Sequence, residues 1–378
     1  MKIPANIILV VMLSAGIGLF AQGTATAPTT APAPAAAPAP DAPKPWTMGS
    51  IRITGLIDGY YSKNFNNPAS GNNVLRNFDV KSNSLTLNMT KISLTHDADP
   101  VGFTLDLGFG RAWDVFHATE PSGSGIVNYI PQAFVSFKPQ NAGGLQIDFG
   151  KFYTSAGAEL TENNLTWSYS RGYLYANGPY YHAGLRVTKP LTKSFSAGVQ
   201  LVNGWNNVED NNSGKTLGFT TAWTGSKISW FNSYYTGPEK KGTNQGFRNF
   251  YDTVVNINPN DKTSMYINFD YGQDKRLASG SDTWIALGLA TRFQLTKTMA
   301  FSPRYEVYDD RDGFITGQKQ KLQSFTLTGE YKWAQGLLSR LEYRKDWSDQ
   351  AFFDRGNQNA SAKSQSTVLL GLVAFFGQ

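Results

Sequence analysis

The feature that most constrains the fold of this 378-residue chain is a long series of short alternating segments. In each segment, apolar and polar residues tend to alternate with a period of two, which is typical of a strand with one apolar and one polar face. The pattern predicts sixteen strands: 50–62, 83–96, 101–110, 129–138, 144–152, 181–189, 194–204, 214–224, 227–236, 247–256, 263–273, 282–294, 298–309, 321–333, 336–347 and 365–376.

The connections between these segments alternate in length. Short links such as 97–100, 139–143 and 190–193 are followed by long ones such as 111–128, 153–180 and 348–364. Propellers and sandwiches do not require this alternation. It predicts an all-β fold, a transmembrane antiparallel up-and-down β-barrel of about 16 strands, with short periplasmic turns and long extracellular loops.

The composition is compatible with such a barrel. The mean hydropathy is −0.34 and charged residues make up 16% of the chain. Barrel strands turn half of their residues toward the lumen, so the mean stays low even when the outer face is apolar. Aromatic residues near the strand ends predict two interfacial girdles, one including Trp223, Trp333 and Phe376 and the other including Trp205 and Tyr235.

The last thirteen residues, Ser366 to Gln378, fit a membrane strand that closes the barrel beside 50–62. The alternative, a buried strand ending a soluble sandwich, does not explain the alternating connections. We expect the apolar residues of the inner face to pack under an inserted loop, and a charge at Leu372 to block assembly while the same change at Gly371 is milder. The predicted outer face is Val368, Leu370, Leu372, Ala374 and Phe376, and the inner exceptions are Leu369, Val373 and Phe375.

The N-terminal region predicts three parts. Residues 1–23 read as a signal peptide, with Lys2 before an apolar run from Ile7 to Phe20 and cleavage after Ala21 or Gly23. Residues 24–47 form a Pro/Ala-rich periplasmic linker, which is either a passive spacer or a tether to a partner. Residues 48–378 form the outer-membrane barrel. The chain has no cysteine and therefore no disulfide.

Other functional classes find little support. The formal charge of +6 is spread over the chain without a basic run, which argues against nucleic acid. The histidines at 96, 117 and 182 lack a G-x-S-x-G serine, so we expect no enzyme. The acidic turn 309–313 lacks the closing glutamate of a calcium loop, and no motif predicts a metal or cofactor.

Charged residues at inward positions predict the lining of a pore. In a water-filled lumen they are expected to remain solvated, and opposed acids and bases would set a field across the path. The alternative is a mutually neutralising ladder that only stabilises the wall. The candidates are Asp106, Asp148, Arg186, Arg292, Arg304, Glu306, Glu330, Lys332, Arg340, Glu342, Arg344 and Asp346.

The longest connection, 153–180, has twenty-eight residues and carries Glu159, Glu162 and Arg171 together with several aromatic residues. Long connections in a compact domain are usually functional or disordered. We expect this loop to fold inward and constrict the pore. The alternative is an ordinary surface loop.

Several ordered segments resemble those of the OmpL-like β-barrel porin family of Gram-negative bacteria. They include G-Y-Y-S at 59–62, L-R-N-F-D at 75–79, D-P-V-G-F at 99–103, Q-A-F-V at 132–135, F-G-K-F at 149–152 and V-N-G-W-N at 202–206. The resemblance is strongest over residues 55–215. It implies a channel in the cell outer membrane and transfers no solute-binding residue.

Three functions fit these observations. The first is a porin for passive diffusion of small hydrophilic solutes through an aqueous barrel. The second is a substrate-specific channel, for instance for sugars, and the third is a plugged barrel acting as an adhesin or structural protein. The expected partners are outer-membrane lipid, the solutes, the outer-membrane assembly machinery and, by analogy with general porins, two further copies in a homotrimer.

Overall fold

The computed structural model describes residues 46–120 and 125–377. The predicted signal peptide and nearly all of the linker lie outside the described residues. The barrel prediction can be compared with the structure over almost its whole length.

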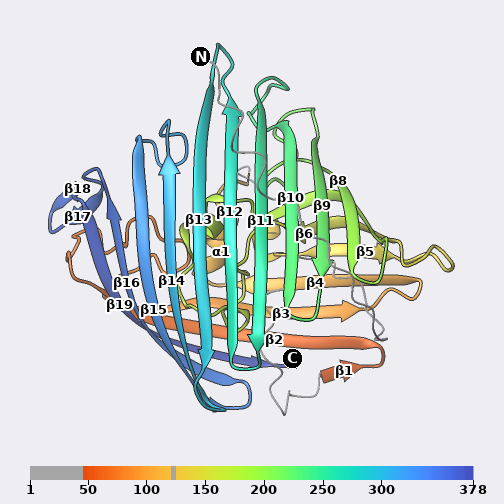
Figure 1. The fold of residues 1–378 in the computed structure, drawn as a ribbon, viewed down its shortest axis with the longest axis horizontal. Coiled ribbons are helices and arrows are strands. Elements are labelled where there is room, and N and C mark those ends of the chain that lie inside the picture. Colours follow the sequence, from red (N-terminus) through yellow and green to blue (C-terminus); the bar gives the residue numbers. More distant parts are fainter. Residues whose placement is uncertain (1–45, 121–124, 378) are drawn as a thin grey trace.

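Sixteen strands form one closed antiparallel barrel (Figure 1). All sixteen correspond to the predicted segments. They are β2 (Ile51–Asn64), β3 (Leu85–His96), β4 (Val101–Phe109), β5 (Ala133–Phe137), β6 (Gln146–Tyr153), β7 (Tyr181–Pro190), β8 (Phe195–Val202), β9 (Thr216–Thr224), β10 (Ile228–Pro238), β11 (Phe247–Asn260), β12 (Thr263–Lys275), β13 (Ser281–Gln294), β14 (Met299–Asp310), β15 (Gln320–Ala334), β16 (Leu337–Ser348) and β19 (Ser364–Phe376).

Three further short strands of the described chain do not belong to the sixteen wall strands. β1 (Trp46–Met48) pairs with the start of β2, and β17 (Phe353–Arg355) pairs with β18 (Gln358–Ala362) in the last long loop. β5 is shorter than the predicted 129–138, because the 3-10 helix η1 (Gly125–Tyr129) precedes it and Pro131 lacks the amide proton that a strand ladder needs.

The terminal strand closes the barrel as predicted. β19 pairs with β2 over ten rungs, from Thr367 opposite Asn64 to Phe376 opposite Gly55, and with β16 on its other side. The ring of Phe376 covers Gly55, where a Cβ atom would lie 2.1 Å from it. Closure pairs every wall strand on both sides and leaves no free edge in the membrane.

The two faces of the wall have opposite chemistry. Large apolar side chains such as Leu87, Leu341 and Leu372 point outward and are more than half exposed. Polar and charged residues alternate with them and are buried inside. This reverses the arrangement of a soluble protein and matches a wall that meets lipid outside and a polar lumen inside.

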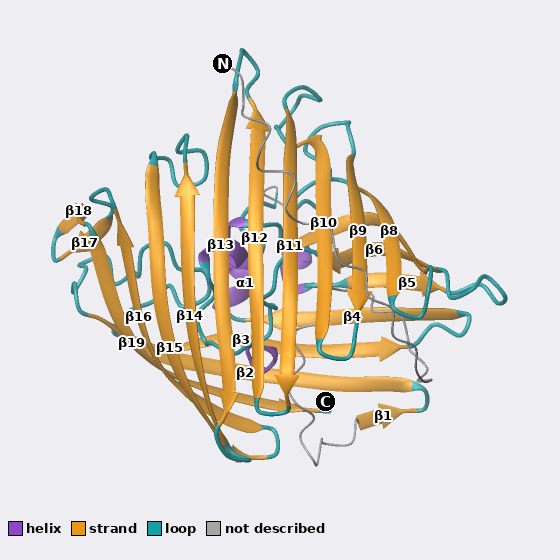
Figure 2. Cartoon of the chain, viewed as in Figure 1, coloured by secondary structure: helices purple, strands orange, loops and turns teal. Residues whose placement is uncertain are grey.

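The helices lie inside the ring of strands (Figure 2). α1 (Arg111–Phe116) contacts β3 and β4, whereas α2 (Tyr173–Asn177) contacts β12, β13 and β14. η2 (Asn163–Leu165) contacts β19. Among the described residues, no helix is both long enough and apolar enough to cross a membrane. Since α1, α2 and η2 all belong to long connections between strands, segments of the long loops occupy the interior.

Candidate functional site: a loop across the barrel interior

The loop between β6 and β7, residues 154–180, folds into the barrel. Its side chains and backbone bond to strands on several sides of the wall. The Ser155 amide donates to the Tyr235 hydroxyl on β10 at 3.3 Å, and the Ala158 amide donates to the Asn268 side chain on β12 at 3.1 Å. Ser168 is 3.3 Å from Thr328 on β15. The loop thus crosses the interior instead of covering the outside.

Two arginines of the wall bind the backbone of this loop. Arg340 on β16 donates to the carbonyl of Asn163 at 2.5 Å and to that of Thr166. Arg344, four residues farther along β16, donates to the carbonyl of Arg171 at 2.6 Å. A guanidinium offers five donors in a fixed plane, so it can hold a loop carbonyl and a carboxylate together.

Arg304 on β14 makes a third attachment. It donates to the Ser170 carbonyl at 2.7 Å and to Glu159 at 2.5 Å. Glu159 in turn accepts from the Gly172 amide at 2.6 Å. The carboxylate therefore ties one half of the loop to the other as well as to the wall.

Two strands beyond β19, β2 and β3, hold the loop through Asn163 and Glu162. Glu162 pairs with Lys91 on β3 and accepts from the Tyr153 hydroxyl at 3.0 Å. Asn163 donates to Asp58 on β2 at 2.6 Å. Arg171 does not reach the wall with its guanidinium. It donates to carbonyls of the loop itself at Leu160, Thr161 and Tyr169, at 2.7 to 2.8 Å, and so fixes the loop's shape.

All twelve candidate wall residues lie at inward positions, but the expected solvation is wrong for most of them. Eleven are buried, from Arg344 at 0% exposed to Arg292 at 7%, and Lys332 is half-buried. The sequence could not show that loops cover them. Buried charges must be paired or hydrogen-bonded, because desolvation without a partner costs several kcal/mol per ion.

The pairing is extensive. Asp148 takes two bonds from Arg186 at 2.8 and 3.0 Å, and Glu330 lies between Arg292 and Arg340 at 2.8 Å from each. Asp346 lies between Arg344 at 2.7 Å and Arg76 at 2.8 Å. Glu342 instead accepts from the loop amides of Tyr169 and Ser170 at 2.7 and 3.2 Å. The wall charges therefore form ion pairs with one another and with loop groups.

Lys91, Arg76 and Asp79 belong to this network but are absent from the predicted set. Lys91 was missed because a bulge places both Asn88 and Met89 inside, which shifts the later residues of β3 to the opposite face. Arg76 lies in the loop between β2 and β3, where no strand period applies, and its partners Asp79 and Asp346 are 3 and 270 residues away. The bulge leaves no clear local signal in the sequence.

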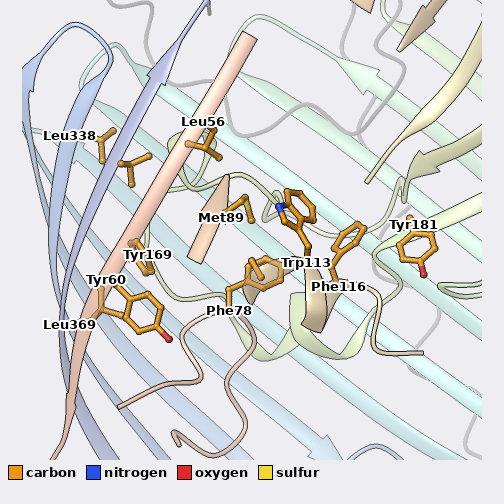
Figure 3. Packing of buried hydrophobic residues seen from close by; sticks show 12 residues of the cluster. Leu56, Tyr60, Phe78, Met89, Trp113, Phe116, Tyr169, Tyr181, Leu338 and Leu369 are labelled. Atoms are coloured by element: carbon orange, nitrogen blue, oxygen red, sulfur yellow. The ribbon is translucent and has the colours of Figure 1, made fainter. Parts of the chain in front are cut away.

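An apolar cluster joins three loops inside the barrel (Figure 3). Phe78 comes from the β2–β3 loop, Trp113 and Phe116 from α1, and Tyr169 from the inserted loop. Leu369 and Val373 of β19 belong to the same cluster, and Phe375 packs against it. The inner apolar residues of β19 do pack under inserted segments, as predicted.

A charge at Gly371 is predicted to be milder than one at Leu372, and the structure adds that Gly371 is itself constrained by its surroundings. A Cβ atom built at this glycine would lie 2.2 Å from the ring of Tyr169, well inside van der Waals contact. Gly371 is required for the close approach of the loop to β19. The predicted girdle also loses two members, because Tyr235 is 1% exposed and Trp205 packs against Phe250 and Trp284 in the interior.

A second loop, 110–132, carries a buried histidine. His117 lies 2.7 Å from Lys151 of β6 and beside the rings of Phe116 and Tyr181. Burial, together with the charge of Lys151, lowers the pKa of His117 to about 3. The neutral ring accepts from Lys151 through Nε2 and donates to the Trp113 carbonyl through Nδ1 at 2.9 Å. No group of three His, Cys, Asp or Glu residues among those described could hold a metal.

A closed sixteen-stranded wall, apolar outside and charged inside, with a loop across its interior, defines an outer-membrane β-barrel of the porin class. Comparison with known proteins agrees. The chain matches the family model "Putative beta-barrel porin-2, OmpL-like" over residues 50–376, and it belongs to this family. The protein is accordingly a channel-type barrel of the outer membrane. No curated protein is significantly similar in sequence.

Solved porins share the fold. An anion-selective porin from Comamonas acidovorans aligns with a TM-score of 0.60 and 14% identity, over 86% of this chain and 99% of that one. The outer membrane channel DcaP of Acinetobacter baumannii aligns with a TM-score of 0.59 and 10% identity, over 88% and 100%. OprB of Pseudomonas putida aligns with a TM-score of 0.58 and 11% identity, over 86% of this chain and 94% of that one. At these identities the likeness concerns the fold alone.

Proposed function

We propose that the protein is a porin for passive diffusion of small hydrophilic solutes, with the loop 153–180 as its constriction. The observation that carries the proposal is the attachment of this loop to walls on several sides of the barrel. A segment that is held from β3, β12, β14 and β16 at once must reduce the free cross-section between them. Glu159 and Glu162 take part in this attachment, and Arg171 keeps the loop's conformation.

We propose that the twelve inward charges surround the constriction, where Lys332 is half-exposed to the path and the other eleven are covered by neighbouring groups. Their support is the strand parity, which directs them to the lumen, and the half-exposed Lys332. Because the acids and bases are largely paired, we expect weak ion selectivity in place of a strong preference for one sign.

Deletion of Thr161 to Ser168 tests the constriction. It removes the carbonyls that Arg340 binds and the carboxylate that Lys91 binds. Single-channel conductance in planar bilayers is expected to rise. A matched control is deletion of 355–361 in the β17–β18 hairpin, which is largely exposed and should leave conductance unchanged.

The outcomes separate the hypotheses. Unchanged conductance after the loop deletion would refute the constriction while leaving a channel. No conductance in either the intact protein or the deletion would favour the plugged adhesin or structural barrel, which the loop-filled interior makes a specific alternative. Block of conductance by a sugar would identify a substrate-specific channel.

Two further parts of the proposal concern processing and assembly. We propose that a signal peptide, residues 1–23, is cleaved on export, that the assembly machinery inserts the barrel, and that the mature protein forms a homotrimer. Support for the trimer comes from the short strand β5. Its five residues span only about 13 Å of membrane at ordinary rise and tilt, which is less than the apolar band of about 25 Å on such barrels, so a neighbouring copy would cover the barrel at this strand. Chemical cross-linking in native outer membranes would show a trimer band.

A further inference from the structure

An apolar groove lies on the outer wall where β2, β3 and β19 meet. Its volume is about 460 Å³, and it is lined by Ile57, Tyr61, Leu85, Leu87, Leu370 and Leu372 among others. The leucines at these positions are 52% to 86% exposed. Gly59 and Ala374, which carry little or no side chain, form part of its lining. The volume is within the range of roughly 300–1,000 Å³ that is usual for small-molecule sites.

The chemistry changes in ordered steps from this groove toward the long-loop end of the wall. Tyr61 on β2 is opposite Leu370 of β19, and two residues farther Lys63 is opposite Val368. On the other side of β19, Leu341, Tyr343 and Lys345 follow one another at outward positions of β16. On both strands that neighbour β19, the outward positions are therefore apolar near the groove, then tyrosine, then lysine toward the long-loop end.

The two lysines are available to an outside anion. Neither Lys63 nor Lys345 has a carboxylate within ion-pair distance among the residues that the structure describes. Lys63 donates to the side chain of Asn67 at 2.6 Å, and Lys345 is exposed. They come from opposite sides of β19 at neighbouring rungs, Lys345 opposite Ser366 and Lys63 opposite Val368.

We propose that this face binds an anionic, phosphate-bearing lipid with several acyl chains in the outer leaflet of the membrane. The acyl chains lie in the groove, the tyrosines occupy the interfacial depth that such rings prefer, and Lys63 and Lys345 contact the phosphates. The argument for this occupant is charge complementarity directly above an apolar groove. The site lies on the outer wall, so it goes beyond the channel function and does not depend on it.

The test measures binding of lipid A, a bis-phosphorylated disaccharide lipid with several acyl chains, to the full-length mature protein in detergent by native mass spectrometry. Phosphatidylcholine, whose zwitterionic headgroup has no net charge, is the comparison lipid. The double variant Lys63→Ala with Lys345→Ala is expected to weaken lipid A binding about 30-fold, since each lysine near an anionic headgroup contributes about fivefold. Phosphatidylcholine binding should not change.

The control variant is Lys275→Ala. Lys275 is an exposed lysine at the long-loop end of β12, away from the groove, and its removal should leave lipid A binding within about twofold. Heat-modified gel mobility verifies that each variant is folded. If the double variant does not fold, Lys63→Gln and Lys345→Gln are measured singly, each with an expected loss of about fivefold.

Two results would overturn the inference. One is equal lipid A affinity for the intact protein, the double variant and Lys275→Ala. The other is a disulfide between two copies through Leu370→Cys at full yield in native membranes, which would show that a second copy covers the groove.

Discussion

Arg340 is the residue whose loss should change the interior most. Its guanidinium is 1% exposed and makes five hydrogen bonds, two to Glu330 at 3.0 and 2.8 Å and three to carbonyls of the inserted loop, at Asn163, Thr166 and Ser168. In Arg340→Met the apolar side chain offers no donor. Glu330 would retain only Arg292, at 2.8 Å, and the three loop carbonyls would lose this donor.

The magnitude follows from this environment. Removing one partner of a buried ion pair costs about 3–5 kcal/mol, because the other charge stays buried without compensation. Since about 1.4 kcal/mol corresponds to a tenfold change, the balance between docked and undocked loop should shift by roughly two to four orders of magnitude. Water entering from the lumen would place the effect at the lower end.

Single-channel recording and limited proteolysis of the folded protein measure the result. We expect Arg340→Met to give larger, more fluctuating conductance and faster cleavage within 154–180. Lys332→Met is the matched control for cleavage of the loop, because Lys332 is inward but half-buried and forms no ion pair with a described residue. The double variant Glu330→Gln with Arg340→Met should recover part of the loss. Conductance and cleavage equal to those of the unmodified protein would refute the assignment of Arg340 as an anchor.

Three further predictions rest on the structure and a fourth on the sequence. Leu372→Lys should destabilise the barrel by about 2–4 kcal/mol and reduce assembly, because it places a charge on the lipid face. Gly371→Ala should assemble but release Tyr169 and raise conductance. Equal yields of the two variants in a gel-shift assay of folding would contradict the assignment of Leu372 to the outer face and Gly371 to the inner face. Ser168→Cys with Thr328→Cys, in a chain without cysteine, should form a disulfide that suppresses conductance fluctuations until dithiothreitol is added. His117 has a folded-state pKa of about 3, lowered first by burial and then by Lys151, against roughly 6.5 when unfolded, so its contribution to docking of the loop 110–132 is complete above about pH 6.5 and is lost as the pH falls toward 3. Hydrogen exchange of residues 113–117 should accelerate with acidification and lose this pH dependence in His117→Gln. N-terminal sequencing of the protein from outer membranes should begin after Ala21 or Gly23; a chain that starts with Met1 would contradict cleavage.

The wall of this barrel could be predicted from the sequence because each strand carries its own signal. A period of two over eight or more residues places alternate side chains on opposite faces, whatever the neighbouring strand is. The outward set on β19 and the inward position of the twelve charged residues follow from this local rule. The alternation of short and long connections then determines that consecutive strands are antiparallel and which end carries the loops.

The interior depended on contacts that no local pattern encodes. The inward residues Leu369 and Val373 are explained only by the interior cluster that includes Tyr169, about 200 positions away, and Gly371 is constrained by the ring of Tyr169. A single bulge at Asn88 moves Lys91 into the lumen, where it meets Glu162. Strand periodicity reports which face a side chain occupies, because that is fixed by the backbone of its own strand. What covers that side chain is decided by loops that return from elsewhere in the chain, and only the tertiary structure shows that they bury the charges of the wall.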